Sequence, residues 1–409
     1  MTWDLLGTWR ALTAKPPREL LRRAVARLGE RLDVAGLGMP LRSDDIADSA
    51  AVPAGRGEWM PHPAGAAPRA AWVVIPPGPG SGGHTTLFRM MRAAQAAGFA
   101  NTLVFYDPFG SDFAARAAIV RRAWPWLQCE IRPIGADLSG YDVVVASSWP
   151  TAHVVATRRL RGQPAVYFVQ DFEPYFSPRG TEYALAEDSY RLGLRIIALG
   201  DMVAGCLRDQ TGANCDVVPF GCDRDVYRVL RPGAPRRGVV LYARRGTDRR
   251  GYPLAVRALE RFHRLRPDEP IHVYGDAPRD LPFPVIAHGG LTPAELNTLY
   301  NHAVAGIALS FTNISLVAEE MLAAGTIPVV NDSPLARADL HHPHVAWARP
   351  TAAAIATALA DVVDRARADP ALADTVAAQV TTASWDATGA RVAEILCDEL
   401  ARAGRAARP

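Results

Sequence analysis

The feature that most constrains the fold of this chain is an alternation of short apolar runs with amphipathic stretches that begins near residue 71. Apolar runs bounded by turn residues are typical of buried strands, and an apolar period of 3.6 residues is typical of helices. Strands that alternate with helices predict a mostly parallel sheet. In the first half, strands are expected over residues 70–76, 101–106, 141–148, 164–171, 195–200 and 215–221, and helices over 84–99, 113–126 and 152–160.

The alternation stops at residues 223–238, DRDVYRVLRPGAPRRG, and then starts again. A repeat of the pattern after such a break predicts a second domain of the same type. Its strands are expected over residues 239–244, 270–276, 284–290, 304–310 and 326–332, and its helices over 252–265, 292–303, 314–325 and 351–368.

The length of 409 residues also favours two domains, because a single core rarely grows beyond about 250–300 residues. The predicted fold class is α/β, with two doubly wound, Rossmann-like domains that face a central cleft. Ligands of such sheets bind at the carboxyl ends of the strands, so a site in the cleft is expected. The expected divisions are 1–70 for an N-terminal extension and linker, 71–225 and 226–380 for the two domains, and 381–409 for a C-terminal helix.

Residues 18–32, RELLRRAVARLGERL, have the pattern of a basic amphipathic helix. Two interpretations stay open, a helix packed on its own domain and a helix that touches an anionic membrane surface. The N-terminus lacks an apolar signal core, and no later apolar run approaches the roughly 18 residues of a membrane span. The five cysteines lack CxxC spacing and predict neither a disulfide framework nor a zinc site. A cytoplasmic protein is expected, either free or peripheral at the inner face of the membrane.

The charged residues exclude several kinds of chemistry. The net charge is only +3, and no segment forms a basic stripe of the kind that binds nucleic acid. The only lysine is Lys15, in the N-terminal extension, so a Gly-Lys phosphate loop, a pyridoxal Schiff base and a lysine nucleophile are all disfavoured. Any phosphate must therefore be bound by arginine, whose planar fork suits oxyanions.

The first domain opens with a glycine-rich turn, PPGPGSGGHTTLFRMM, between its first strand and first helix. Backbone N–H groups at Gly82 and Gly83 could face an anion or let a sugar approach closely. The match to the dinucleotide fingerprint GxGxxG is loose, and Asp107, the acid after the next strand, is followed by proline. A glycine-rich turn without a ligand is the alternative interpretation.

The second domain carries an arginine cluster and, further along, a polar turn that leads into a helix. Arg244, Arg245, Arg249 and Arg250 follow the first strand of that domain, where they could face a diphosphate or simply be solvated. The turn TNIS leaves the N–H groups of residues 314–316 free at a helix start in the same cleft. Glu319 and Glu320 follow one turn later. Adjacent helical residues point about 100° apart, so only one of the two acids is expected to face a ligand and the other to be solvated.

These motifs resemble those of the retaining GT-B glycosyltransferases of family 4, whose nucleotide-sugar site contains the pattern ExFGxxxxEAMAxGxPV. EMLAAGTIPVV aligns with it when Glu320 is placed on the second acid, and Thr312 then stands on the first. VVPFGCD resembles the family's VIPNGVD, Arg244 and Arg250 fall where the family has Arg and Lys, and ASWDATGARVAEIL resembles its terminal helix. The similarity extends from about residue 71 to 400, and it implies the GT-B fold with a C-terminal helix that crosses back to the first domain.

A narrower resemblance concerns the bacterial rhamnosyltransferase branch of that family. It is carried by SGGHTTLFRM, YFVQDFEPYFSPRGTEYALAEDSY and SFTNISLVAEEMLAAG, the last of which has an S-x-T-N-x-S-L turn in place of the first acid. The resemblance implies transfer of L-rhamnose from dTDP-β-L-rhamnose, with retention and without a metal, to a saccharide or lipid-linked saccharide acceptor of a bacterial surface glycan. Thr312 is then a feature of the branch and not a lost catalytic group.

The resemblance also implies roles for individual residues. Glu320 would hold the ribose hydroxyls of the donor, while Arg244, Arg250 and the amides of Ile314, Ser315 and Leu316 would hold its diphosphate. Thr312 and Asn313 would lie near the donor sugar, where a hydroxyl and an amide suit a 6-deoxy sugar that has one hydroxyl fewer to bind. The donor is a co-substrate, and no other cofactor is expected.

In the first domain, family members have a histidine after the strand that here reads AVYFVQD, where this chain has Gln170 and Asp171. Asp171 could orient an acceptor hydroxyl or balance charge as the glycosidic bond breaks, or it could cap the next turn. Further candidates for acceptor binding are His84, Gln170, Glu173 and Glu182.

The sequence also contains one acidic motif that is typical of metal sites, and it leaves several other functions open. Asp223-Arg224-Asp225 spells the DxD metal motif but lies between the domains, so metal dependence is not expected. Alternative functions are a GT-B enzyme that uses a UDP- or GDP-sugar, an NAD-dependent oxidoreductase, and a non-catalytic glycan-binding protein.

Overall fold

A computed structural model describes residues 39–51, 55, 57–61, 63, 65–314 and 316–406. The chain divides into two compact units, Met1–Ile46 with Pro108–Gly110, and Ala47–Asp107 with Ser111–Pro409. The described part of the first unit includes the 3-10 helix η1 (Ser43–Asp45). The predicted amphipathic helix at 18–32 lies outside the described residues. The following paragraphs concern the second unit.

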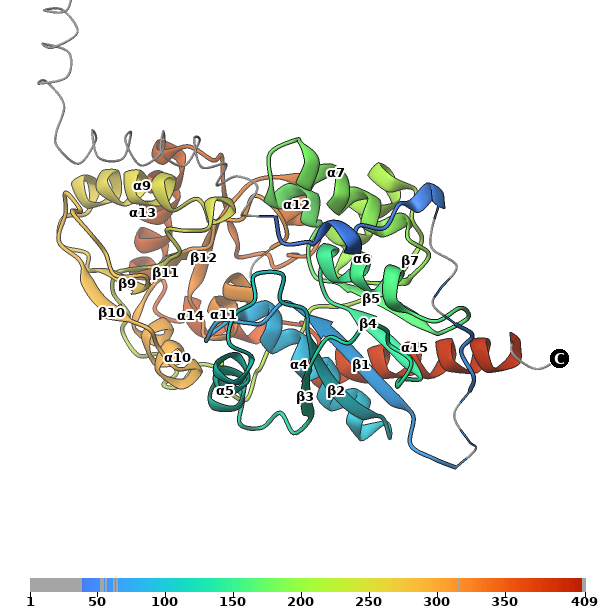
Figure 1. Cartoon of the computed structure of the whole chain (residues 1–409). Helices are drawn as coiled ribbons and strands as arrows, with labels where there is room; N and C mark the ends of the chain where they lie inside the picture. Colours follow the sequence, from blue (N-terminus) through green and yellow to red (C-terminus); the bar gives the residue numbers. More distant parts are fainter. Residues whose placement is uncertain are drawn as a thin grey trace, which may run out of the picture. The chain divides into compact units, whose positions relative to one another are not determined.

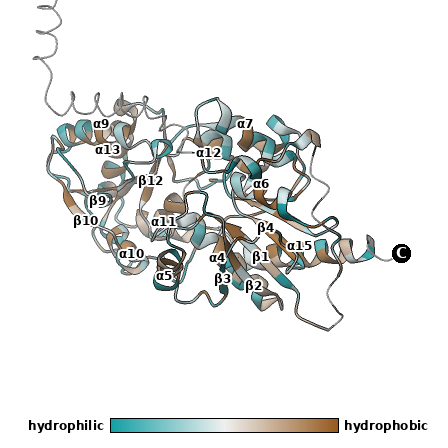
Figure 2. Cartoon of the chain, viewed as in Figure 1, coloured by the Kyte–Doolittle hydropathy of each residue, from teal (hydrophilic) through white to brown (hydrophobic). Residues whose placement is uncertain are grey.

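The first sheet is seven-stranded and parallel, with the strand order β3-β2-β1-β4-β5-β6-β7 (Figure 1). Apart from Arg69 at the start of β1, the central strands β1, β4 and β5 are buried and consist of Val, Ala and aromatic residues (Figure 2). The strands are β1 (Arg69–Val74), β2 (Ala100–Phe105), β3 (Glu130–Pro133), β4 (Val143–Ala146), β5 (Ala165–Val169), β6 (Arg195–Leu199) and β7 (Cys215–Val218).

Helices connect these strands and cover the sheet. The buried side chains of α4, α5 and α15 share one hydrophobic core with the first sheet, in which Trp72, Phe88 and Leu396 are buried. The helical segments are η2 (Ser49–Ala51), α4 (Gly82–Ala96), α5 (Phe113–Ala123), α6 (Trp149–Arg158), η3 (Glu173–Phe176), α7 (Thr181–Asp188), η4 (Ser189–Arg191), α8 (Asp201–Cys206) and the π-helical turn η5 (Leu207–Thr211).

The second sheet is six-stranded and parallel, with the order β10-β9-β8-β11-β12-β13. Its strands are β8 (Val239–Ala243), β9 (Ile271–Gly275), β10 (Ile286–Gly289), β11 (Ala305–Ile307), β12 (Ile327–Asn331) and β13 (Ala346–Ala348). Its helical segments are η6 (Asp248–Arg250), α9 (Tyr252–Leu265), α10 (Pro293–His302), α11 (Leu316–Ala323), α12 (Pro334–Arg337), α13 (Ala352–Ala368) and α14 (Leu372–Ala378).

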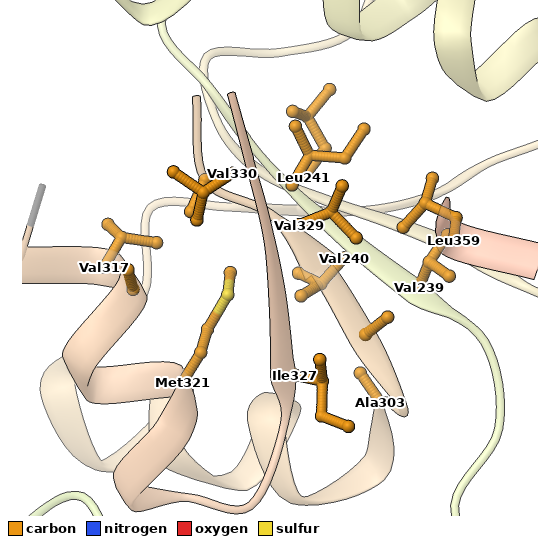
Figure 3. Close-up of a cluster of buried hydrophobic side chains, with 14 of the residues drawn as sticks. Val239, Val240, Leu241, Ala303, Val317, Met321, Ile327, Val329, Val330 and Leu359 are labelled. Atoms are coloured by element: carbon orange, nitrogen blue, oxygen red, sulfur yellow. The ribbon is translucent and has the colours of Figure 1, made fainter. Parts of the chain in front are cut away.

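Helix α11 is fixed to the second sheet by its apolar side. Met321 points from α11 toward β12, on the side of the strand where Val317 and Val330 lie, while Val329 lies on the opposite side (Figure 3). Strand β11 carries Gly306 at this point, and a Cβ there would lie 2.7 Å from the Met321 sulfur, so only glycine leaves room for that side chain. The close fit holds α11 against β11 of the second sheet.

Two chain segments join the two sheets. Residues 219–222 lead from β7 toward β8, and residues 382–385 lead into α15 (Trp385–Ala406). The two segments pair, since the Cys222 amide donates to the Ala383 carbonyl at 3.0 Å. Gly221 permits the contact, because a Cβ there would lie 2.7 Å from the Trp385 backbone and ring. After this crossing, α15 packs along α4 of the first sheet.

Some elements were not expected. Strand β3 at the edge of the first sheet consists of Glu, Ile, Arg and Pro and is largely exposed, so no apolar run marks it. Strand β13 and the short helices α7, α8, α12 and α14 were also not predicted, since each is shorter than the pattern needed to recognise it. Within the described part of the chain, no helix is long and apolar enough to cross a bilayer.

Candidate active site

The centre of the site is a direct contact between the end of β5 and the turn after β11. The Thr312 hydroxyl donates to Asp171 Oδ2 at 2.8 Å, and the Asn313 amide N–H donates to Asp171 Oδ1 at 3.3 Å. Asn313 Nδ2 donates to the Gln170 carbonyl at 2.6 Å. Two consecutive residues that follow β5 of the first sheet are thereby joined to two consecutive residues of the turn after β11 of the second sheet.

Asp171 is 6% exposed, and its charge is balanced by arginines. Arg249 Nε lies 3.9 Å from Asp171 Oδ2. Burial raises the pKa of the Asp171 carboxyl above its ordinary value, while the Thr312 hydrogen bond and the charges of Arg250 and Arg249 oppose the rise. A buried carboxylate next to two guanidinium groups marks this point as the main charged centre between the sheets.

The arginine loop reaches this centre because of a glycine. Gly251 ends the turn η6 with φ of +63°, and a Cβ at this position would lie 2.9 Å from the ring of Phe311 and 3.1 Å from Leu309. Glycine therefore lets the loop pack against the turn after β11. The amide of Phe311 also donates to the Arg249 carbonyl at 3.0 Å.

Arg250 and Ser310 hold the turn in place. Arg250 Nη1 donates to Ser310 Oγ at 2.8 Å, and the same hydroxyl donates to the Asn313 carbonyl. Asn331, at the end of β12, accepts from the Ser310 amide at 2.8 Å and donates to the Ser310 carbonyl at 2.7 Å. Desolvation lowers the pKa of the Arg250 guanidinium from its ordinary value, and the nearby Asp171 carboxylate opposes this shift.

Two arginines of the cluster lie further out. Arg244 is exposed, with its guanidinium 5.8 Å from the centre of the Tyr242 ring. Arg245 is exposed as well, and its amide donates to Asp276 at 2.7 Å. The predicted donor ligands Arg244 and Arg250 thus differ in burial, and only Arg250 is part of the hydrogen-bonded turn.

The glycine-rich turn of the first sheet lies on the other side of Gln170. Helix α4 starts at Gly82, and a Cβ on Gly83 would lie 3.7 Å from the side chain of Gln170. His84 Nε2 lies 3.1 Å from the Ile75 carbonyl, which can only accept, and His84 Nδ1 lies 2.8 Å from Ser81 Oγ. Both ring nitrogens of His84 are therefore engaged within the turn, and burial lowers the pKa of the ring. Its predicted role in acceptor binding remains a prediction.

The start of α11 is only partly described. Ile314 is buried in the second core, and Leu316 packs against the first core. Ser315, the remaining residue of the predicted diphosphate-binding amides, lies outside the described residues.

The two glutamates of α11 have different surroundings. Glu320 faces the ion pair of Arg89 and Asp223, and burial raises its pKa to about 7, with hydrogen bonding from Tyr227 opposing the rise. Glu319 accepts from the Thr382 hydroxyl at 2.6 Å. Glu319 is partly buried against the segment that leads into α15, so it is less solvated than expected.

A cavity of about 340 Å³ adjoins Glu319. It is lined by the ends of β6 and β7 and by the segment before α15, and it includes Asp339 and His341. None of the arginines in the loop after β8 borders it. The hydrogen-bonded centre around Asp171 is therefore better evidence for the reaction site than the size of this cavity.

The other acids of the first sheet are engaged within it. Glu173 accepts from the Trp149 amide at 2.6 Å at the start of α6, and its own amide donates to the Tyr190 hydroxyl at 3.0 Å. Burial raises the pKa of Glu173 to about 8. Glu182 accepts from Ser177 Oγ at 2.7 Å. The structure thus brings Asp171, Gln170, Thr312, Asn313 and Arg250 together, and it places Glu173 and Glu182 in local contacts of the first domain.

Two polar atoms at the centre are buried without a hydrogen-bond partner among the described residues, Asn313 Oδ1 and Arg249 Nε. Such atoms are uncommon in folded proteins and mark places where a ligand could bind. Asn313 is 8% exposed, and Arg249 packs its guanidinium 4.1 Å from the centre of the Phe176 ring.

A metal site is not evident in the part of the chain that the structure describes, where no group of three or more His, Cys, Asp or Glu side chains is placed to hold an ion. Asp223, the first acid of the DxD sequence, forms an ion pair with Arg89.

Three residues of the centre were not singled out from the sequence. The sequence identifies Arg249 only as one member of the arginine cluster. Its ion pair with Asp171 joins residues that are 78 positions apart, and the sequence pattern does not predict such a contact. Ser310 and Asn331 each end or follow a strand of the second sheet, which is where functional polar residues of such sheets are found. That position is the signal that could have identified them.

Comparison with known proteins identifies domains and chains to which this chain is similar. Models of the N-terminal and C-terminal domains of WsaF match residues 134–202 and 237–360. The O-antigen biosynthesis protein RfbC of Myxococcus xanthus is 32% identical over 343 residues, which cover 79% of this chain and 26% of that protein. The chain therefore spans about a quarter of the length of this curated relative.

Several solved structures are similar in fold. Sucrose-phosphate synthase of Thermosynechococcus elongatus has a TM-score of 0.55 at 14% identity, covering 83% of this chain and 98% of that one. HepE of Anabaena in complex with UDP-glucose has a TM-score of 0.60 at 15% identity, covering 81% and 100%. WaaG, a glycosyltransferase involved in lipopolysaccharide biosynthesis, has a TM-score of 0.57 at 13% identity, covering 80% and 99%. These likenesses, with the two parallel sheets, confirm the predicted fold class: the chain has the GT-B fold.

Proposed function

We propose that this chain is a glycosyltransferase that moves a sugar from a nucleotide-sugar to a saccharide acceptor in the biosynthesis of a bacterial surface polysaccharide. The observation that carries the proposal is the meeting of Arg249, Arg250 and the turn after β11 with Asp171 at the carboxyl ends of two parallel sheets. Guanidinium groups and backbone amides of a turn that leads into a helix suit the diphosphate of a donor. The matches to WsaF and to an O-antigen biosynthesis protein support the substrate class.

The finer proposal is a retaining, metal-independent family 4 enzyme that transfers L-rhamnose from dTDP-β-L-rhamnose. It is supported by the S-x-T-N-x-S-L turn and by the absence of an acid at Thr312. A hydroxyl and an amide at positions 312 and 313 suit a 6-deoxy sugar, which offers one hydroxyl fewer. A UDP-sugar or a GDP-sugar is the alternative donor.

Charge on the leaving phosphate is the main chemical problem of such a transfer. In the proposed mechanism, the bond between the anomeric carbon and the phosphate oxygen breaks while Arg244, Arg250 and the amides of residues 314–316 stabilise the developing negative charge. The acceptor hydroxyl attacks from the same face, and its proton passes to the departing phosphate. Glu320 is proposed to hold the ribose hydroxyls.

Acceptor binding is proposed for the first domain. Asp171 and Gln170 lie at the centre, where Asp171 could orient the acceptor hydroxyl. His84, Glu173 and Glu182 are the remaining candidates, and their local contacts make a supporting role the simplest one. An acceptor linked to a lipid would place the enzyme at the inner face of the membrane.

The test is transfer with defined donors. The purified chain is incubated with dTDP-β-L-rhamnose, UDP-glucose or GDP-mannose and a rhamnose-containing acceptor, and release of the nucleoside diphosphate and the anomeric configuration of the product are measured. We expect release and a product of retained configuration with the dTDP donor. Turnover of none of the three donors contradicts the proposed function, and turnover of a UDP- or GDP-sugar alone contradicts the assignment of rhamnose.

A further inference from the structure

The carboxylate of Asp171 is held in this structure as a bound anion would be. One oxygen accepts from the Thr312 hydroxyl at 2.8 Å and lies 3.9 Å from Arg249 Nε, and the other accepts from the Asn313 amide at 3.3 Å. A hydroxyl, a backbone amide at a turn and a guanidinium are the groups that bind phosphate oxygens in proteins. The residues around Asp171 are therefore an oxyanion site that is filled by a side chain of the protein.

The surroundings of this oxyanion site are rigid. Arg250 and Asn331 hold Ser310 by direct hydrogen bonds, and Ser310 in turn holds the Asn313 carbonyl, so the backbone next to the Asn313 amide is held in place. Arg249 is fixed by its contact with the Phe176 ring, 4.1 Å from the guanidinium carbon. A preformed site of this kind does not need to be assembled by its ligand.

The oxyanion site also has unused binding capacity. Arg249 Nε is buried, has no hydrogen-bond partner among the described residues, and is too far from Asp171 for a direct bond at 3.9 Å. A phosphate has more acceptor oxygens than a carboxylate and a larger charge, so it can satisfy this group as well as the hydroxyl and the amide. Desolvation of Arg249 and Arg250 makes a second negative charge at this point favourable.

We propose that this oxyanion site, formed by Thr312 Oγ1, the Asn313 amide and Arg249, is a phosphate site in which Asp171 acts as a resident substitute for the ligand. The phosphate of an incoming donor takes the place of the carboxylate and binds Arg249. Asp171 is thereby released from the turn, and its carboxylate becomes free to accept a hydrogen bond from an acceptor hydroxyl. The site rests on the proposed function only in identifying the phosphate as that of a nucleotide-sugar; the exchange itself requires only a phosphate anion.

The exchange makes a specific prediction about Asp171. If the carboxylate competes with phosphate for the same donors, removing its charge strengthens phosphate binding. If Asp171 only ties the two domains together, removing its charge leaves phosphate binding unchanged or weakens it, because the site becomes less ordered. Arg249 contributes to phosphate binding, with or without the Asp171 carboxylate, only if it contacts the phosphate.

The experiment is isothermal titration calorimetry of the full chain with inorganic pyrophosphate, which has no base or sugar. The variants are Asp171→Asn, Arg249→Gln and the double variant. The controls are Glu260→Gln and Arg264→Gln, an exposed ion pair on α9 that matches the removed charges. If Asp171→Asn is not correctly folded, as judged by unfolding in a single transition, the titration is repeated with Asp171→Ser.

We expect Asp171→Asn to bind pyrophosphate about tenfold more tightly than the unmodified chain, and Arg249→Gln to weaken binding about tenfold in both backgrounds. The two controls should change the affinity less than twofold. Unchanged or weaker binding by the Asp171 variants, or an Arg249 variant with unaltered affinity, overturns the proposal. A crystal structure with pyrophosphate in which Thr312 still bonds Asp171 overturns it too. Because no sugar is transferred in these measurements, their failure is distinct from a failure of the proposed glycosyltransferase activity.

Discussion

Replacement of Arg250 by glutamine is the perturbation that bears most directly on how the leaving group is stabilised. Arg250 is the guanidinium that both holds the turn, through Ser310 at 2.8 Å, and lies within electrostatic reach of Asp171. Glutamine keeps a side-chain donor but removes the positive charge. The variant therefore tests the positive charge of Arg250 while it keeps most of the side chain's packing.

The expected loss can be worked out from the contacts. A hydrogen bond made by a charged group contributes about 1.5–3 kcal/mol to stability, which is small beside a typical total of about 5–15 kcal/mol, so the variant should fold. Loss of one preorganised donor to a developing negative charge costs about 2.7–4 kcal/mol in the transition state, which corresponds to a roughly 10²–10³-fold lower kcat. The change in turnover should therefore exceed the change in stability.

The assay is steady-state release of nucleoside diphosphate, with urea unfolding of the same preparations. Arg264→Gln, which removes an exposed arginine of α9, is the matched control and should keep normal turnover. Arg244→Gln should also lose turnover, while Asp171→Asn, Glu173→Gln and Glu182→Gln should each lose far less than Arg250→Gln. Normal turnover in the Arg250 variant, or an equal loss in all three acid variants, would refute the idea that the arginines carry the leaving-group charge.

Three further predictions concern the framework of the site. Gly251→Ala should lower the free energy of unfolding in urea by about 1–3 kcal/mol, because φ at Gly251 is +63° and the added Cβ would lie 2.9 Å from the Phe311 ring. Unaltered stability would show that the loop can move away from Phe311. Met321→Ala should cost about 2–5 kcal/mol in the same assay, since Met321 is fully buried beneath β11, and a loss below 1 kcal/mol would contradict the packing in Figure 3. Burial raises the pKa of the Glu173 carboxyl from 4.5 to about 8, so folding favours its protonated form. The stability that the protonated carboxyl provides is fully present below pH 4.5 and is lost as the pH rises toward 8. Glu173→Gln should therefore show a smaller fall in stability between pH 5 and pH 8 than the unmodified chain, and identical pH profiles would count against a buried carboxyl there.

The alternation of strands and helices was enough to predict the fold class, because the inner strands β1, β5 and β8 are buried apolar runs bounded by turn residues. The start of α9 after Gly251 and its end at Leu265 follow directly from the sequence pattern YPLAVRALERFHRL. Strand β3 could not be predicted, since a mostly exposed edge strand with Glu and Arg carries no apolar signal. Such elements are defined by pairing with a neighbour and not by their own residues.

The candidate site shows a similar limit. Motif positions identified Arg250, Thr312, Asn313 and Asp171 separately, and the structure joins all four in one network. The hydrogen bond between Thr312 and Asp171 links residues 141 positions apart, and local sequence contains no information on such a contact. The sequence also predicts a solvated Glu319. Its partial burial beside Thr382 depends on the return of the chain before α15, which is a feature of tertiary structure.

The most direct test of the central claim, that the arginine loop and the turn after β11 bind the diphosphate of a donor, is calorimetric titration with dTDP, UDP, GDP and NAD. We predict that dTDP binds most tightly, that Arg250→Gln weakens its binding at least tenfold, and that NAD does not bind. Binding of NAD, or dTDP binding that is unaffected by the loss of Arg250, would contradict the account.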